Sequence, residues 1–197
     1  MLAPAFDDPA LASQAVFRTV MEALARPGLP RPLVSKLSVP PPLSKTAAAV
    51  ALTLLDYETP FWLDHELAAA GEVAAWFTFH TGAPQATDSA RATFGFVSDP
   101  AAMPPFDAFS PGSLEYPDRS TTLVVQVERF DQGDELLLCG PGIAGTRLFS
   151  AAPLPANFQS QLIANRETFP RGVDLILVSQ TAVAALPRSV RVTTRGD

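Results

Sequence analysis

A run near the end of the chain, VDLILVS at residues 173–179, restricts the fold more than any other feature. Its central residues, Leu175 to Val178, are all large and aliphatic, with no polar residue between them. A strand with one solvent-exposed face alternates between apolar and polar side chains, whereas a strand that is covered on both faces does not. The sequence therefore predicts a sheet with other elements packed on both sides, as in α/β domains.

The turn before this strand reads Phe-Pro-Arg-Gly and leads through Val173 to Asp174. Pro170 fixes the direction of the chain and Gly172 permits a tight bend. We expect the Asp174 carboxylate to accept hydrogen bonds from the turn amides and so to fix the start of the strand. This account needs no catalysis, although Arg171 at the mouth of a strand is also compatible with a ligand cleft.

Cap and turn signals divide the rest of the chain into short helices and strands, in agreement with its 20 prolines. In the first helix, Phe17, Val20, Met21 and Leu24 fall on one face, and Arg18 lies off that face. The predicted helices are 9–26, 44–56, 64–76 and 155–167, with an extended piece and a turn at 78–84 and a long surface loop at 98–120. The predicted strands are 61–63, 92–97, 122–130, 134–140, 173–179, 182–187 and 190–194.

Asp131, Gln132 and Gly133 stand between the strands 122–130 and 134–140, which predicts a β-hairpin. The strands cluster before and after the fourth helix, so the pattern is not a regular β-α-β series. We expect one α/β domain with three layers, in which helices pack on a mixed sheet.

Composition limits the possible partners. The net charge is −6, only two lysines occur, Lys36 and Lys45, and the arginines form no basic stripe, so we expect no nucleic-acid partner. The single cysteine excludes an internal disulfide and a metal site made of several cysteines. Because only 17% of the residues are charged and 13 are Phe, part of the surface is expected to be covered by a partner subunit.

The first ten residues lack the basic and apolar regions of a signal peptide, and no apolar run reaches the length of a membrane span. The sequence therefore predicts a cytoplasmic protein without membrane contact.

The two histidines, His65 and His80, have no second ligand at metal-binding spacing, so we expect no metal site. His80 lies in FHTGAP beside Thr81 and a glycine. Two interpretations stay open: its ring bonds a backbone carbonyl and holds the turn, or it lines a cleft.

Two other polar stretches also allow either a structural or a functional interpretation. CGPGIAGT follows a strand but lacks the lysine of a phosphate-binding loop, which favours a turn. Asp56 and Glu58 stand beside Thr59, either in a solvated turn or at a pocket on a strand edge.

Four arginines stand next to turns or strand ends and are candidates for an anion site, since guanidinium groups bind phosphate and carboxylate through two nitrogens. The alternative is pairing with the excess acidic residues at the surface or between subunits. The four are Arg18, Arg119, Arg171 and Arg188.

Several stretches follow one another in a distinctive order: VFRTVMEALARPG, LLDYETPFWL, FHTGAP, a short Phe-rich strand, GSLEYPDRSTTLVVQV, GPGI, FPRGVDLIL and ALPR. In this order they resemble the PhnH family, a subunit of the bacterial carbon–phosphorus lyase core complex. The resemblance covers the chain from about residue 10 to residue 194. Each stretch alone is weak, and the order and spacing together make the resemblance specific.

The resemblance implies one PhnH-like domain over residues 1–197, similar to a trimmed large domain of pyridoxal-phosphate-dependent transferases without the cofactor lysine. It implies a homodimer that joins PhnG, PhnI and PhnJ type subunits so that bacteria can use alkylphosphonates. That assembly forms a ribose 1-alkylphosphonate 5-triphosphate from ATP and a phosphonate, and its radical iron–sulfur step is assigned to PhnJ. We therefore expect a non-radical accessory subunit that has no independent activity and holds no cofactor or metal.

The resemblance also marks seven residues as candidates for a small-anion or partner-contact site, without a catalytic role for any of them. They are Arg18, Asp56, Thr59, His80, Thr81, Asp174 and Arg188. The alternative function is a degenerate transferase-fold module that binds a small anion or nucleotide and has a regulatory role.

Overall fold

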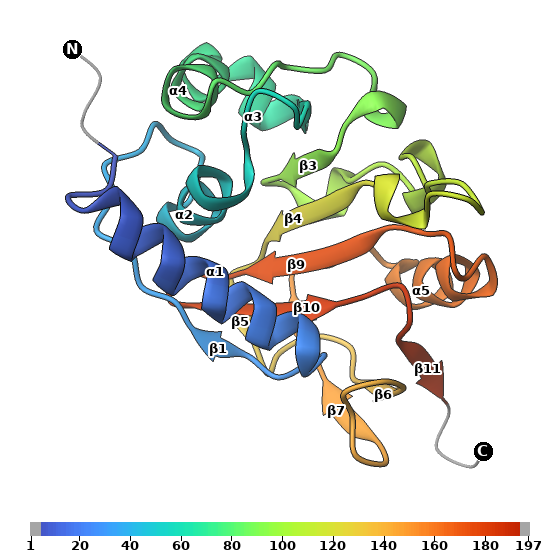
Figure 1. Cartoon of the computed structure of the whole chain (residues 1–197). Helices are drawn as coiled ribbons and strands as arrows, with labels where there is room; N and C mark the ends of the chain where they lie inside the picture. Colours follow the sequence, from blue (N-terminus) through green and yellow to red (C-terminus); the bar gives the residue numbers. More distant parts are fainter. Residues whose placement is uncertain (1–4, 194–197) are drawn as a thin grey trace.

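A six-stranded sheet with the strand order β1-β10-β9-β4-β3-β2 organises the protein, as the computed structural model shows for residues 5–193 (Figure 1). The helices are α1 (Pro9–Ala25), α2 (Lys45–Leu54), α3 (His65–Ala69), α4 (Gly71–Thr81) and α5 (Phe158–Glu167). The sheet contains β1 (Arg31–Pro32), β2 (Phe61–Leu63), β3 (Phe94–Val97), β4 (Thr122–Gln126), β9 (Asp174–Val178) and β10 (Ala182–Leu186).

Smaller elements lie outside this sheet. A three-stranded sheet has the order β11-β6-β7, and β5 pairs with β8. These strands are β5 (Arg129–Phe130), β6 (Leu136–Cys139), β7 (Arg147–Phe149), β8 (Ala151–Ala152) and β11 (Arg191–Thr193). Four 3-10 turns complete the set: η1 (Ser89–Arg91), η2 (Pro100–Ala102), η3 (Phe106–Ala108) and η4 (Pro117–Arg119).

The apolar run from Leu175 to Val178 lies in β9, near the centre of the large sheet. It pairs in parallel with β4 and antiparallel with β10, and its residues from Leu175 to Val178 are at most 1% exposed. Strands β2, β3, β4 and β9 are parallel, while β10 and β1 run antiparallel to their neighbours. The predicted mixed sheet within an α/β domain is therefore confirmed.

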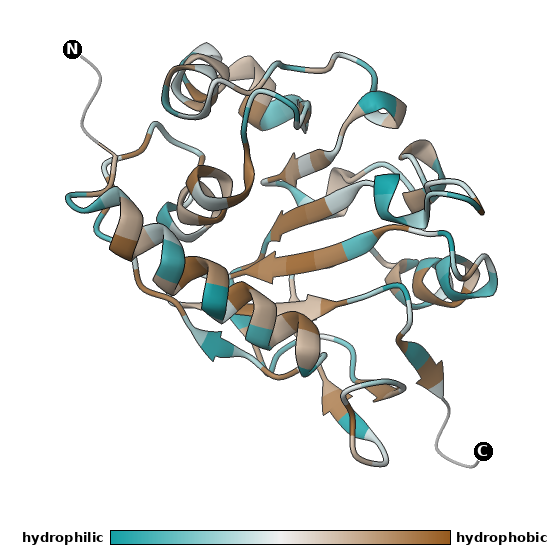
Figure 2. Cartoon of the chain, viewed as in Figure 1, coloured by the Kyte–Doolittle hydropathy of each residue, from teal (hydrophilic) through white to brown (hydrophobic). Residues whose placement is uncertain are grey.

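Each face of the sheet has its own core, because side chains of a strand alternate between the faces. Val124 and Ile176 pack with residues of α1, α2, α3 and α4. Leu123, Leu175 and Leu177 pack with residues of α5, the loop through η3, and the strands β6 and β7. Figure 2 shows the apolar strands enclosed between these layers, with polar residues on the outward side of α1. The second outer layer is thus a mixture of helix, turns and small strands.

The hairpin predicted around residues 131–133 is wrong. The chain does bend at these residues, and Asp131 and Gly133 have positive φ angles of 66° and 89°. However, β4 belongs to the large sheet between β3 and β9, whereas β6 pairs with β7 and β11. Both edges of β4 are occupied by parallel partners, so β6 cannot pair with it.

The helix predicted for residues 64–76 is interrupted, and the extended piece predicted for 78–84 is wrong. The chain breaks after α3 and continues as α4 to Thr81, where Gly82 ends the helix in the left-handed conformation at φ 72°. The aromatic residues Trp76 and Phe77 are buried within α4 and hold it against the sheet.

The predicted face of α1 packs inward only at Val20, which is buried, and at Leu24, which packs against the core. Val16, Val20 and Ala23 are buried, whereas Phe17 and Met21 are 48% and 47% exposed. Small side chains on α2, which carries five alanines or valines in the run from Ala47 to Ala51, let α1 approach closely along the Val16–Ala23 line.

Asp64 connects two strands at their carboxyl ends. Its carboxylate accepts hydrogen bonds from the amides of Leu67 (2.9 Å), Ser98 (2.6 Å) and Asp99 (2.9 Å), and from the Ser98 hydroxyl. Asp64 is 6% exposed and Leu67 is fully buried, so water cannot readily replace the carboxylate as the acceptor of the Leu67 amide. The predicted N-terminal cap of the third helix is confirmed, and it also anchors the chain that leaves β3.

We predict that Asp64→Ala lowers the free energy of unfolding by about 2–4 kcal/mol, because it removes a helix cap and leaves the buried Leu67 amide and two half-buried amides without their acceptor. Asp8→Ala is the matched control, since Asp8 caps α1 with one hydrogen bond to Leu11 at 3.1 Å on an exposed site. It should cost about 1 kcal/mol. Urea unfolding measures both, and equal losses would contradict the clamp role of Asp64.

Candidate functional site

The seven candidate residues fall into three places. Asp174 and Arg188 meet at one end of β9 and β10, and Asp56, Thr59, His80 and Thr81 lie where two turns run side by side. Arg18 is exposed on α1, apart from both groups. The structure therefore brings six of the seven candidate residues into two groups and leaves Arg18 apart, so that they do not form a single cleft.

Arg188 and Asp174 form a tightly bonded pair. Asp174 Oδ1 accepts from the Arg188 amide at 2.8 Å and from Nε at 3.1 Å, and Oδ2 accepts from Nη2. Arg188 Nη1 donates to the Pro117 carbonyl, and Nη2 also donates to the Ser120 hydroxyl at 2.5 Å. The pair thus joins the start of β9, the end of β10 and the turn η4.

This bonding occupies the guanidinium group. Every nitrogen of Arg188 already donates within the protein, and the side chains of Arg188 and Asp174 are 14% and 20% exposed. An anion at Arg188 would have to compete with the Asp174 carboxylate, which is closer and already oriented. The arrangement favours a structural clamp over an anion site.

The Asp174 prediction is correct in outcome but wrong in partner. Asp174 fixes the start of its strand, yet its donors come from Arg188 rather than from the turn amides. Those amides bond elsewhere: Gly172 N donates to the Pro111 carbonyl at 2.8 Å, and Val173 N donates to Asn165 Oδ1 at 2.8 Å.

The turn at 56–59 closes on itself. Thr59 Oγ1 accepts from the Asp56 amide at 2.7 Å and lies 3.1 Å from Asp56 Oδ1, which also accepts from the Glu58 amide at 2.9 Å. These bonds make it an Asx-type turn that positions Tyr57 outward, where it is 75% exposed.

The second turn lies against the first. Phe61 bonds to Pro84 and Ala86 through its backbone, and a β-carbon built at Gly82 would stand 4.0 Å from the Tyr57 β-carbon. The end of α4 and the turn before β2 are therefore neighbours although more than 20 residues separate them in sequence.

His80 does not hold this turn through a carbonyl, which was one of its two interpretations. Thr81 does so instead, donating to the Phe77 carbonyl at 2.7 Å and accepting from the Ala83 amide at 3.1 Å. The His80 ring packs against the Trp76 ring at a tilt of 55°, with the ring centroids 4.6 Å apart, and its Nε2 is buried without a hydrogen-bond partner. Burial lowers the pKa of the His80 imidazole below its usual value, so the ring favours the neutral form.

The edge of the sheet on which these residues lie is informative. Phe61, Phe94, Thr122 and Asp174 form one row across the parallel strands, so both groups of candidates flank the amino ends of β2 and β9. Three strand spacings, about 14 Å, separate β2 from β9. Open α/β sheets bind ligands outside the carboxyl ends of their strands, which is the opposite edge.

The carboxyl edge is closed by the protein's own chain. Gln126, at the end of β4, accepts from the Ser44 amide and donates to the Pro42 carbonyl at 3.3 Å. Beside it, Thr46 donates to the Gln180 carbonyl at 3.1 Å just beyond β9. The start of α2 thus covers the place where a sheet ligand would bind.

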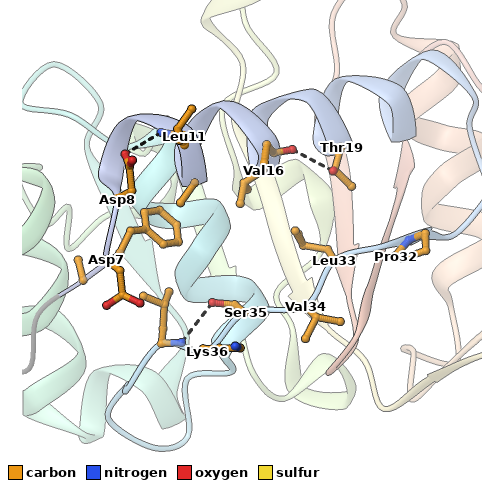
Figure 3. A pocket seen from close by; sticks show the side chains of 15 residues that line it. Asp7, Asp8, Leu11, Val16, Thr19, Pro32, Leu33, Val34, Ser35 and Lys36 are labelled. Carbon is orange, nitrogen blue, oxygen red and sulfur yellow. Dashed lines mark hydrogen bonds between the residues drawn. The ribbon is translucent and has the colours of Figure 1, made fainter.

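A groove that the sequence analysis missed runs along the first half of α1 (Figure 3). It has a volume of about 620 Å³. Leu11, Val16 and Thr19 line one side, and the segment 32–37 with Lys36 lines the other. One sign of it is present in the sequence, an apolar Val34 within a proline-rich crossing, and in the structure Val34 is 72% exposed.

The charges of this groove do not suit an anion. Asp7 and Asp8 stand at its end, and Lys36 is its one cationic side chain among the described residues. Two carboxylates near one ammonium repel phosphate and carboxylate ligands.

The glycine-rich stretch CGPGIAGT is the turn between β6 and β7, as the sequence favoured. A β-carbon at Gly142 would lie 2.2 Å from the Ala25 carbonyl oxygen, so glycine is required by packing against the end of α1. Within residues 5–193, no group of three His, Cys, Asp or Glu side chains could hold a metal ion, and no described helix is long and apolar enough to cross a membrane.

Comparison with known proteins gives consistent matches. A family model described as bacterial phosphonate metabolism protein (PhnH) matches residues 4–193. The chain is 43% identical over 188 residues to the alpha-D-ribose 1-methylphosphonate 5-triphosphate synthase subunit PhnH of Rhizobium meliloti (strain 1021), covering 95% of this chain and 94% of the relative. It is 40% identical over 85 residues to the putative C-P lyase subunit protein HtxG of Stutzerimonas stutzeri, covering 43% of this chain and 44% of that protein.

We predict that Arg188→Ala and Asp174→Ala each lower the free energy of unfolding by about 2–3 kcal/mol, because each leaves a partly buried charge unpaired. The double variant should lose less than the sum, with a coupling of about 1–3 kcal/mol. Arg18→Ala is the control and should change stability by less than about 0.5 kcal/mol. Denaturant unfolding of the four proteins tests this, and additive losses would refute the clamp.

We also predict a pH effect at His80. Because burial lowers the pKa of His80 in the folded state, the unfolded chain takes up a proton first as pH falls, and stability is lost below about pH 6.5. His80→Phe should remove this part of the loss between about pH 7.5 and pH 5.5, whereas His65→Gln, at an exposed site, should retain it. Denaturant unfolding at several pH values measures the effect, and an unchanged pH profile in His80→Phe would contradict it.

Proposed function

The chain belongs to the PhnH family, and from that premise we propose that it works as the non-radical accessory subunit of a carbon–phosphorus lyase core complex. In this role it is the PhnH subunit of ribose 1-methylphosphonate 5-triphosphate synthase, in the pathway by which bacteria use phosphonates. The observation that carries the proposal is the 43% identity to a named subunit of that synthase over nearly the whole length of both chains.

The geometry supports a role in assembly rather than turnover by the isolated chain. The Arg188 guanidinium makes four hydrogen bonds, to Asp174, η4 and Ser120, and the start of α2 covers the carboxyl ends of β4 and β9. These contacts stabilise the fold and direct the polar groups inward. A subunit of this kind contributes a shaped surface to the complex.

The proposal includes the oligomeric state of the chain, its partner subunits, its compartment and its relation to a known fold. We propose that the chain forms a homodimer, joins PhnG, PhnI and PhnJ type subunits, and works in the cytoplasm, where ATP is available. We propose that its fold is a trimmed transferase large domain, which the parallel run β2-β3-β4-β9 with both faces covered supports. Superposition on solved transferases would test the fold, and light scattering of the purified chain would test the dimer.

The seven candidate residues stay a prediction for contacts with a small anion or a partner. Their positions favour a partner for Asp56, Thr59, His80 and Thr81, because these residues flank a surface and not a closed pocket. The alternative function, a regulatory module for a small anion or nucleotide, requires an uncompensated cationic group, whereas Arg188 is paired with Asp174 and Lys36 shares the α1 groove with two carboxylates.

We predict that a strain lacking this chain fails to grow with methylphosphonate as its sole phosphorus source and grows normally on phosphate. A tagged copy should restore growth and recover the other synthase subunits in near-equal amounts. Leu148→Ala, at an exposed site on β7, should behave like the wild type. Recovery of the tagged chain alone, together with growth of the deletion strain on methylphosphonate, would refute the proposal, and a nucleotide-dependent rise in its melting temperature would favour the alternative.

A further inference from the structure

Two large aromatic side chains stand exposed on one surface of the protein. Phe79 on α4 is 67% exposed, and Tyr57 in the preceding turn is 75% exposed. Helix α4 buries Val73, Trp76 and Phe77 against the sheet, so Phe79 is an additional apolar side chain on its outward side. A helix that is apolar around its circumference is normally covered on both sides.

These aromatic residues belong to one patch. Phe79 and Gly82 are three residues apart at the end of α4, which places them on the same side one turn apart. A β-carbon at Gly82 would stand 4.0 Å from that of Tyr57. Glu72, Ala75 and Phe79 have the spacing of one helical face and are exposed. The α4 surface, as we name it, consists of Asp56, Tyr57, Glu58, Glu72, Ala75 and Phe79.

The patch is held in shape before any partner arrives. Hydrogen bonds between Asp56 and Thr59 close the turn that carries Tyr57. The Phe79 ring meets the His80 ring edge-on, with centroids 5.0 Å apart, and the His80 ring packs at a tilt against buried Trp76, with centroids 4.6 Å apart. Pre-ordered side chains reduce the entropy cost of binding, which is a property of interface anchors.

The charge of the protein is concentrated in the same part of the chain. Residues 46–90, which lie between Lys45 at the start of α2 and Arg91 at the end of η1, contain six of the 20 Asp and Glu residues and none of the 14 Lys and Arg residues. The other 14 acidic and 14 basic residues balance, so this segment carries the whole net charge of −6. Of its six acids, Asp64 is buried, while Asp56, Glu58 and Glu72 are exposed on the α4 surface.

We propose that the α4 surface is the docking site for an arginine-rich face of another subunit of the complex. Arginine suits both features of the patch, because its guanidinium stacks on aromatic rings and pairs with carboxylates. A second copy of this chain does not suit it, since a two-fold contact would bring the same acidic patch against itself. The inference rests on the proposed function, which supplies the complex, and adds the surface and the chemistry of the partner.

The test uses the synthase complex assembled from the tagged chain and the other subunits of its host. Tyr57→Ala and Phe79→Ala should each reduce the recovery of those subunits or their affinity by at least about tenfold, as expected for interface anchors. Glu58→Arg should also weaken binding, and raised salt should weaken the wild-type contact. Leu148→Ala and Glu128→Arg, at exposed sites outside the α4 surface, are the matched controls and should bind normally. Unchanged melting temperatures confirm that the variants fold.

The outcomes separate the two proposals. If the wild-type chain recovers no other subunit, the proposed function fails. If the wild type assembles and the Tyr57 and Phe79 variants assemble equally well, the function stands and the docking surface is refuted. If the isolated chain is a dimer that Phe79→Ala dissociates, the occupant is a second copy, and the assignment to an arginine-rich partner is overturned.

Discussion

The removal of β9 from water is the constraint on which the rest of the structure depends. Every side chain from Leu175 to Val178 is buried, and both backbone edges are bonded, to β4 on one side and β10 on the other. A strand in this position can place polar groups only at its two ends. Asp174 stands at one end with Arg188, and Ser179 stands at the other, where it accepts hydrogen bonds from its own turn. The chemistry of the protein is therefore confined to the edges and outer surfaces.

The two edges are used differently. At the carboxyl edge, Asp64 and Gln126 bond the starts of α3 and α2 onto the strands. At the amino edge, Arg188 bonds β9 and β10 to η4. At both edges these polar side chains form hydrogen bonds within the protein. A buried donor or acceptor that is satisfied in this way is unavailable to a ligand. An α/β sheet that closes its ligand edge keeps the stability of that fold class without its usual binding site.

Local patterns predicted much of this fold, because they report on local physics. The non-alternating run at 175–178 identified β9, and the cap signals at Asp8 and Asp64 identified two helix starts. The failures required long-range information. The turn at 131–133 has the right local chemistry, but the partners of β4 and β6 are decided by strands elsewhere in the chain. In α1, the buried line was displaced from Phe17 to Val16 because the alanines of α2 allow a close approach.

The candidate residues, too, could be singled out from the sequence, but the contacts that they make could not. The resemblance to the PhnH family marked Asp174 and Arg188 as candidate site residues, and the two do lie together, yet the number of hydrogen bonds that they make to each other could not be predicted from their spacing in the sequence. His80 and Thr81 are adjacent in sequence but have different roles. The Thr81 hydroxyl bonds to the backbone at the end of α4, whereas the His80 ring contacts the Phe79 ring.

The uneven distribution of charge along the chain connects the structure with the proposed assembly. A protein whose entire net charge lies in one segment presents an oriented electrostatic surface, which directs the approach of a partner before contact is made. The aromatic residues Tyr57 and Phe79 then provide apolar area at the centre of that surface. Long-range attraction sets which face of the subunit meets the complex, and desolvation of the two rings sets how long it stays, because rim charges act mainly on association and buried anchors on dissociation.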